Sequence, residues 1–129
     1  MVEIVYRKSS LIEAQAGPAS YFTGAVTLER LSNHDDIALT QMRVTFAPGA
    51  RTAWHSHAAG QVLYVTSGNG LFGTRDEVIP IAMGDVIEIP AGLDHWHGAS
   101  PATPMQHIAT QPSAEAKWGP HVSEDDYLR

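Results

Sequence analysis

The segment Gly49-Ala-Arg-Thr-Ala-Trp-His55-Ser-His57-Ala-Ala-Gly-Gln61 holds two histidines separated by one residue, with a glutamine four residues later. Side chains on a β-strand alternate between its two faces, so His55 and His57 point the same way if this segment is extended. Two imidazoles on one face can bind the same metal ion. A lone His-x-His pair, however, is commonly just part of a solvated loop.

A second segment, Gly84-Asp-Val-Ile-Glu-Ile-Pro90-Ala-Gly92-Leu-Asp-His95-Trp-His97, supplies a third candidate ligand. Its Pro-Ala-Gly turn ends a strand shortly before His95. We therefore predict a metal site formed by His55, His57, Gln61 and His95, with the last two contributed by neighbouring strands. The alternative is that these histidines only pack in the interior.

The two segments combine the spacings Gly-x5-His-x-His-x3-Gln-x6-Gly and Gly-x5-Pro-x-Gly-x2-His. Together they resemble the two signature motifs of the cupin family. The resemblance implies an all-β chain, folded as a single jelly-roll-like β-barrel with a metal ion at its mouth or in its interior.

The family usually has Glu at the position of Gln61. Because an amide brings only a carbonyl dipole, a set of three His and one Gln is neutral, and a bound divalent ion keeps its full Lewis-acid charge. The alternative is that Gln61 is merely a polar residue of the barrel.

The bulk composition narrows the class of protein. A chain of 129 residues forms one ordinary domain, here residues 1–129, with a barrel core at about 20–111 and terminal straps outside it. The chain has no cysteine, so any metal must be held by nitrogen and oxygen. A net charge of −6, from 8 basic and 14 acidic residues, argues against nucleic-acid and anionic-membrane partners. There is no long apolar run and no secretory signal, so we expect a cytoplasmic protein.

Short strands separated by turn residues are expected from about Tyr21 to Gln111. Met42, Val44 and Phe46 alternate with polar residues, as in a half-buried strand. The run Ser67-Gly-Asn-Gly70 predicts a turn that separates two strands. The tail after Pro112 is expected to be a strap or terminal turn, packed outside the barrel by Trp118 and Tyr127.

Two further histidines are candidates for proton transfer. His97 shares a face with His95 if the strand is regular, so it is a proton carrier or a structural residue, and less plausibly a fifth ligand. In Met105-Gln-His107-Ile-Ala-Thr-Gln111, period two places His107 and Gln111 on one face. Buried polar groups need partners, and a ligand cavity would give these two residues a function there.

Apolar residues on the predicted strands would line such a cavity, since small-molecule sites combine apolar walls with a few polar groups. Together with Gln111, the candidates are Met42, Val44, Phe46, Leu63 and Val65. For each apolar member, simple core packing is at least as good an explanation.

One subgroup of small cupins is closer in sequence, namely the bacterial manganese-dependent hydroxynitrile lyases. The similarity lies in Tyr21–Val26, Val44–His57, Gly60–Gln61, His95–Ala99, Met105–Gln111 and His121–Tyr127. It implies metal ligation by His55, His57, Gln61 and His95, with His107 beside the substrate. The implied reaction is cleavage of a cyanohydrin to aldehyde and cyanide.

Two other functions stay open from the sequence. The same ligands could serve a dioxygenase acting on a small enol or phenol, or a non-catalytic module that binds a small molecule. Manganese is the expected metal, and iron, nickel, cobalt and zinc also accept imidazole. Small cupins of this kind associate through their sheets, so a homodimer or homotetramer is expected.

Overall fold

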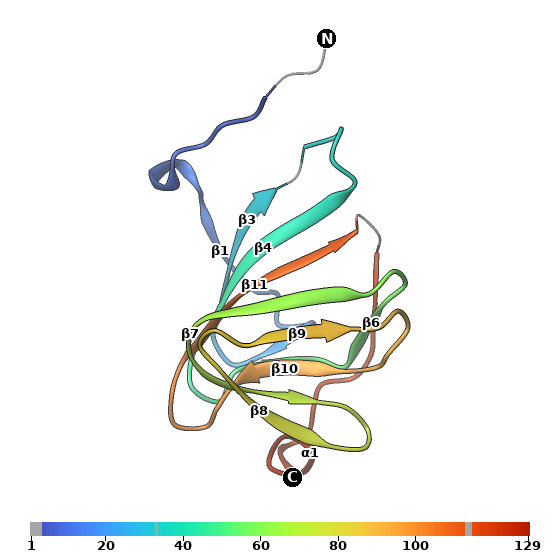
Figure 1. Cartoon of the computed structure of the whole chain (residues 1–129). Helices are drawn as coiled ribbons and strands as arrows, with labels where there is room; N and C mark the ends of the chain where they lie inside the picture. Colours follow the sequence, from blue (N-terminus) through green and yellow to red (C-terminus); the bar gives the residue numbers. More distant parts are fainter. Residues whose placement is uncertain (1–3, 33, 113–114) are drawn as a thin grey trace.

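The protein is described by a computed structural model covering residues 4–32, 34–112 and 115–129. Its antiparallel strands form a strongly curled sheet that makes a half-barrel (Figure 1), which confirms the predicted all-β, cupin-like fold class. The strands are β1 (Ala14–Ala16), β2 (Phe22–Thr23), β3 (Val26–Ser32), β4 (Leu39–Phe46), β5 (Arg51–Thr52), β6 (His55–His57), β7 (Gln61–Gly73), β8 (Val78–Ala82), β9 (Val86–Ile89), β10 (Trp96–Ala99), β11 (Met105–Pro112) and β12 (Ala116–Trp118).

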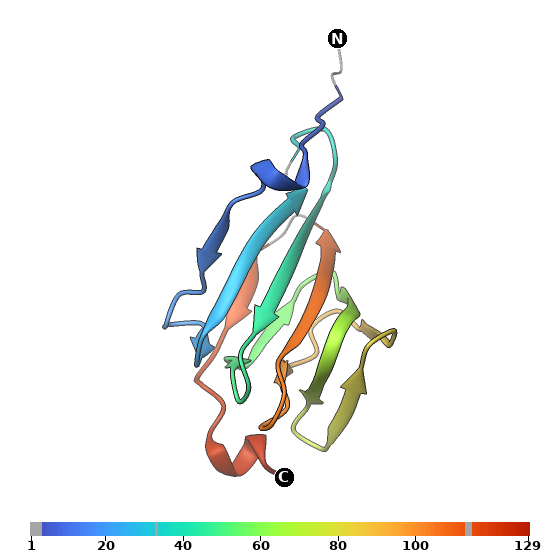
Figure 2. The ribbon, with the colours of Figure 1, turned by 90° about the vertical axis from the view of Figure 1, so that its left-hand side faces the viewer.

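The main sheet runs in the order β1-β3-β4-β11-β7-β10-β5-β2, with β8 and β9 also paired to β7. Strands β1, β3, β4 and β11 lie side by side as one layer (Figure 2). Strands β6 and β12 form a separate pair. Because β11 pairs with both β4 and β7, it joins this layer to the strands that carry the second histidine segment.

The core lies on the concave side of the curl. The alternating residues Val44 and Phe46 of β4, Leu63 and Val65 of β7, and Met105 of β11 are buried there. Each such side chain contributes about 1.5–3 kcal/mol when fully removed from water. The alternation predicted for β4 is therefore present, and it fixes which side chains of each strand face inward.

The turn predicted at Ser67–Gly70 is wrong, because β7 runs through these residues without a break. The strand bends here and changes partners, pairing with β9 before the bend and with β8 and β10 after it. A β-bulge lies at the bend: Gln106 is opposite Ser67 while His107 is opposite Val65, which leaves Thr66 unpaired. Gly68 has φ +78°, and a Cβ there would collide with the Pro104 carbonyl oxygen. A glycine is therefore needed for the backbone of β7 to approach Pro104 this closely.

Strands are present on both sides of the predicted range of 21–111. Strand β1 lies before that range and β12 after it. Neither was recognisable, because Ala-Gln-Ala and Ala-Lys-Trp lack the β-branched alternation that marks a strand. Residues 113–114 of the predicted strap lie outside the described residues.

The two ends of the described chain differ in packing. The chain before β1, which includes a short 3-10 helix η1 (Ser9–Leu11), extends away from the sheet (Figure 1). The C-terminal helix α1 (Glu124–Tyr127) packs on the barrel, where the Tyr127 hydroxyl donates to the Ala99 carbonyl at 2.6 Å. Among the described residues, no helix has the length and apolarity to cross a membrane.

Candidate metal centre

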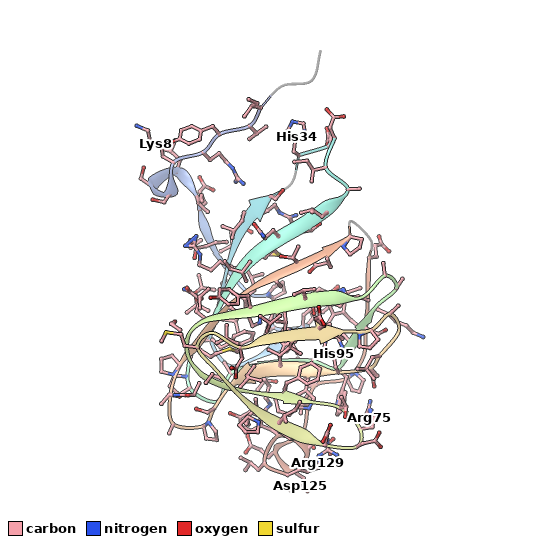
Figure 3. All side chains as sticks on the ribbon, viewed as in Figure 1. Lys8, His34, Arg75, His95, Asp125 and Arg129 are labelled. Carbon is pink, nitrogen blue, oxygen red and sulfur yellow. The ribbon has the colours of Figure 1, made fainter. Side chains whose placement is uncertain are left out.

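His55 and His95 are held side by side by their own backbones. Each donates its N–H to the carbonyl of the other at 2.9 Å, forming an antiparallel bridge. Directly paired residues of antiparallel segments place their side chains on the same face. Their ring centroids are consequently 4.3 Å apart. His95 lies within the curl of the sheet, far from Lys8 and His34 near the N-terminal extension (Figure 3).

The protonation of both rings follows from their backbone contacts. Nδ1 of His55 lies 2.9 Å from the Ala53 carbonyl, and Nδ1 of His95 lies 2.8 Å from the Leu93 carbonyl. A carbonyl only accepts, so each Nδ1 carries the hydrogen. Burial holds the pKa of His55 well below its usual value, with His95 as the next cause, and burial lowers the pKa of His95 to about 4. Both rings are therefore neutral near pH 7, and each presents an Nε2 lone pair.

His57 and Gln61 lie beside these two rings. The His57 ring centroid is 5.2 Å from that of His55 and 5.9 Å from that of His95, and its buried Nε2 has no hydrogen-bond partner. Gly60, which connects β6 to β7, has φ +82° and would bring a Cβ to 2.8 Å from the Ile89 carbonyl. A glycine is thus required for this tight connection.

The Gln61 amide is oriented by Gln111. Its Nε2 donates to Oε1 of Gln111 at 3.1 Å, which turns its own Oε1 to 3.4 Å from Nε2 of His95. In this orientation two lone-pair atoms face each other, because the His95 Nε2 carries no hydrogen. Two facing acceptors repel each other, and a cation between them would remove that repulsion.

His97 and His107 form a second histidine group in contact with the first. Nε2 of His107 lies 2.9 Å from Nδ1 of His97, while the opposite ring nitrogens, His97 Nε2 and His107 Nδ1, are buried without partners. Phe46 packs against the His107 ring with centroids 5.3 Å apart. Burial lowers the pKa of His107 to about 4, and burial followed by His107 holds that of His97 well below its usual value. The pair is therefore neutral near pH 7.

The donor set fits a divalent ion. Among the described residues, one ring nitrogen from each of His55, His95 and His97 lies within 4.8 Å of the other two. Neutral imidazoles and a carbonyl oxygen are ligands that first-row divalent metals accept. Two of the predicted ligands, His55 and His95, belong to this group, and Gln61 directs its oxygen toward His95. His57 is not a member of the group, although its ring centroid is 5.2 Å from that of His55 and 5.9 Å from that of His95. His97 takes the third place in the group, where the sequence pattern predicted His57.

The cluster opens into a cavity of about 410 Å³. Met42, Val44 and Gln111, predicted as pocket residues, line it together with His97 and His107. The other predicted pocket residues, Phe46, Leu63 and Val65, are fully buried in the core and do not line the cavity. The alternation of a strand identifies its inward face, but it does not distinguish a cavity wall from the packed core. A larger hollow of about 680 Å³ beside β1 has no titratable residue in its lining.

Trp118 belongs to this site, and the prediction that it packs outside the barrel is wrong. Strand β12 pairs with β6, so Trp118 lies opposite His55 and stacks on its ring at 4.6 Å. Tyr21 also stacks on Trp118, with ring centroids 4.3 Å apart, and both aromatic residues line the cavity. The sequence contains no local signal for this pairing between distant segments, although an aromatic residue in a polar tail marks an anchor of some kind.

The comparisons with known proteins agree with this geometry. The family model described as Cupin domain matches residues 42–110. The chain is 45% identical to an (R)-mandelonitrile lyase of Granulicella tundricola over 121 residues, covering 88% of this chain and 90% of that protein. It is 34% identical over 76 residues to an acireductone dioxygenase of Picosynechococcus, covering 55% of this chain and only 43% of that protein. A crystal structure of a cupin-like protein from Thermotoga maritima superposes with a TM-score of 0.84 at 36% identity, covering 98% of this chain and 95% of the other.

Proposed function

Because the chain belongs to the cupin family, we propose that it is a metal-dependent lyase that cleaves a cyanohydrin into an aldehyde and cyanide. The observation that carries the proposal is the buried His97–His107 pair, which lines the same cavity as His55, His57 and Gln61. The similarity to a mandelonitrile lyase over most of both chains suggests the reaction.

We propose His55, His57, Gln61 and His95 as the metal ligands. The free Nε2 atoms of His55 and His95, the unpartnered Nε2 of His57 and the inward-turned Gln61 oxygen support this set. A divalent ion held there, for which we propose manganese, supplies Lewis-acid charge to the substrate hydroxyl.

The base comes from the His97–His107 pair. If His107 Nε2 carries the shared hydrogen, the lone pair is on His107 Nδ1; if His97 Nδ1 carries it, the lone pair is on His97 Nε2. In both cases the pair offers one basic nitrogen and one N–H at its two free ends. The basic nitrogen accepts the hydroxyl proton. As the carbon–carbon bond breaks, cyanide leaves with the electron pair and takes a proton back from the pair, so that the products are aldehyde and hydrogen cyanide.

A dioxygenase is the second candidate. It is favoured by the similarity of part of the chain to an acireductone dioxygenase, and a neutral histidine-rich site also suits iron. Oxygen uptake by iron-loaded protein with a small enol would support this function.

The first test is the release of benzaldehyde from mandelonitrile by manganese-loaded protein, compared with metal-stripped protein at mildly acidic pH. We expect release that depends on the metal. A His57→Ala variant with reduced manganese content is the control, and it should lose activity in parallel with the metal. If fully loaded wild-type protein gives no release above the spontaneous reaction, the lyase proposal fails.

A further inference from the structure

Among the described residues, the cavity that contains the histidines has one permanently charged side chain in its lining, that of Arg30. Every other described residue in the lining is apolar, aromatic, amide, hydroxyl or histidine. The chain as a whole carries a net charge of −6, so a cavity whose only fixed charge is positive differs from the rest of the molecule.

The strand register places Arg30 on the inner face. Val26 lies opposite Phe46, Leu28 opposite Val44, and Arg30 opposite Met42, so the three β3 residues continue one inward-facing series. Residues directly opposite on antiparallel strands share a face. The neighbours Glu29 and Arg43 are also opposite each other, but on the outer face, where they form an ion pair at 3.8 Å.

The guanidinium of Arg30 is available to a ligand. It is exposed, and it forms no ion pair or hydrogen bond with any side chain in the described part of the protein. Glu13 and Asp35 each line a neighbouring cavity together with Arg30, and neither is paired with it. Its attraction for an anion is therefore not cancelled by any carboxylate in the described part of the chain.

The position of Arg30 relative to His107 suits a small elongated molecule. Arg30 on β3 is paired with Met42 on β4, and Met42 is paired with Ala109 on β11. His107 lies two residues from Ala109 along β11. With strands about 4.8 Å apart and a rise of about 3.4 Å per residue, the two Cα atoms are roughly 12 Å apart. Leu28, Met42 and Val44 form an apolar wall between them.

We propose that the substrate carries a carboxylate at the end opposite its reactive hydroxyl, and that Arg30 binds this carboxylate. The inference rests on the proposed function and names the substrate class of the same site. The planar guanidinium donates two parallel hydrogen bonds to a carboxylate, and the apolar wall covers the carbon skeleton between the two polar ends. A cyanohydrin whose aryl or alkyl group ends in a carboxylate fits these requirements.

Direct binding tests the proposal without turnover. The probes are 4-formylbenzoate and its neutral analogue 4-formylbenzamide, titrated calorimetrically into manganese-loaded protein. We expect the wild-type protein to bind the carboxylate about fivefold to tenfold more tightly, a modest ratio because the guanidinium is exposed, and we expect the ratio to shrink at high salt. The Arg30→Gln variant should bind both probes equally.

Arg43→Gln is the matched control, because it removes the same charge from the outer face of the neighbouring strand and should keep the wild-type ratio. Equal binding of the two probes by wild-type protein overturns the proposal. A preference that persists in Arg30→Gln also overturns it, since the carboxylate would then bind at the histidines. A preference that depends on Arg30 in a protein without lyase activity supports the carboxylate site and refutes only the proposed reaction.

Discussion

The floor and the rim of the cavity are built from different kinds of polar residue. The floor consists of the buried lining histidines His55, His97 and His107, together with His95, which packs against the His55 ring without reaching the lining, and these rings are held by backbone carbonyls or by each other. The rim consists of Arg30, Thr40 and Gln111, which are exposed or half-buried and lie on β3, β4 and β11. The reaction itself requires groups that are fixed and desolvated, whereas selection of the substrate can rely on solvated groups. Substitutions in the floor should therefore lower activity far more than substitutions in the rim.

The largest expected effect tests the floor directly. Replacing His107 with Ala should lower kcat for cyanohydrin cleavage by about 10² to 10⁴, because it removes one member of the proton-accepting pair. Manganese content, measured by elemental analysis, should stay near the wild-type value. Loss of the metal from this variant would show instead that His107 supports the ligands. A parallel His97→Gln variant indicates which end of the pair carries the base.

An effect of intermediate size is expected when acid lowers the stability of the protein. In metal-free protein the floor histidines have pKa values below 6.5, with His95 and His107 at about 4, so between pH 6.5 and 4 the unfolded state binds more protons than the folded state. The free energy of unfolding should fall as the pH falls, by about 1.4 kcal/mol per pH unit for each such histidine. Urea denaturation at several pH values measures this slope.

The His107→Gln variant assigns the slope to the floor, because it should flatten the slope by one histidine's share. Parallel slopes for wild type and His107→Gln would mean that His107 does not contribute to the acid sensitivity.

The smallest effect is expected at Gln111, a rim residue that orients the proposed ligand Gln61. Gln111→Leu removes the acceptor that orients the Gln61 amide, so the manganese affinity should fall about tenfold, as for other residues that orient a ligand. Thr40→Val, also at the rim but without a contact to Gln61 among the described residues, is the control and should leave the affinity unchanged. A loss of manganese affinity far greater than tenfold would show that a rim residue matters as much as the floor, which would contradict the distinction between the two.

The sequence predicted the fold class and the inward faces of the strands, because hydrophobic alternation and turn residues report local structure. It did not distinguish Phe46 in the packed core from Met42 at the cavity, since both residues follow the same alternation along β4. That distinction depends on how the sheet curls.

Pairing between distant segments was also beyond the sequence. The stacking of Trp118 on His55 depends on β12 pairing with β6, and two strands so short leave no pattern of their own. Arg30 did have a signal, as the third member of the series Val26, Leu28, Arg30, but the inward direction of that series became clear only from the register with β4.

The bulge at Thr66 determines where the length of this chain can vary. Before the bulge β7 buries Gln61, Leu63 and Val65, and after it Gly70 and Phe72 are buried, with Gly73 at the strand end, so the alternation changes from odd to even numbers at this residue. Deleting Thr66 would remove the bulge and keep Gly70 and Phe72 inward, because Val65 and Ser67 already lie opposite consecutive residues of β11. A deletion or insertion of one residue elsewhere in β7 would instead reverse the faces of the strand beyond it and turn Phe72 outward. The bulge is therefore the position in β7 at which one residue can be lost without reversing the strand.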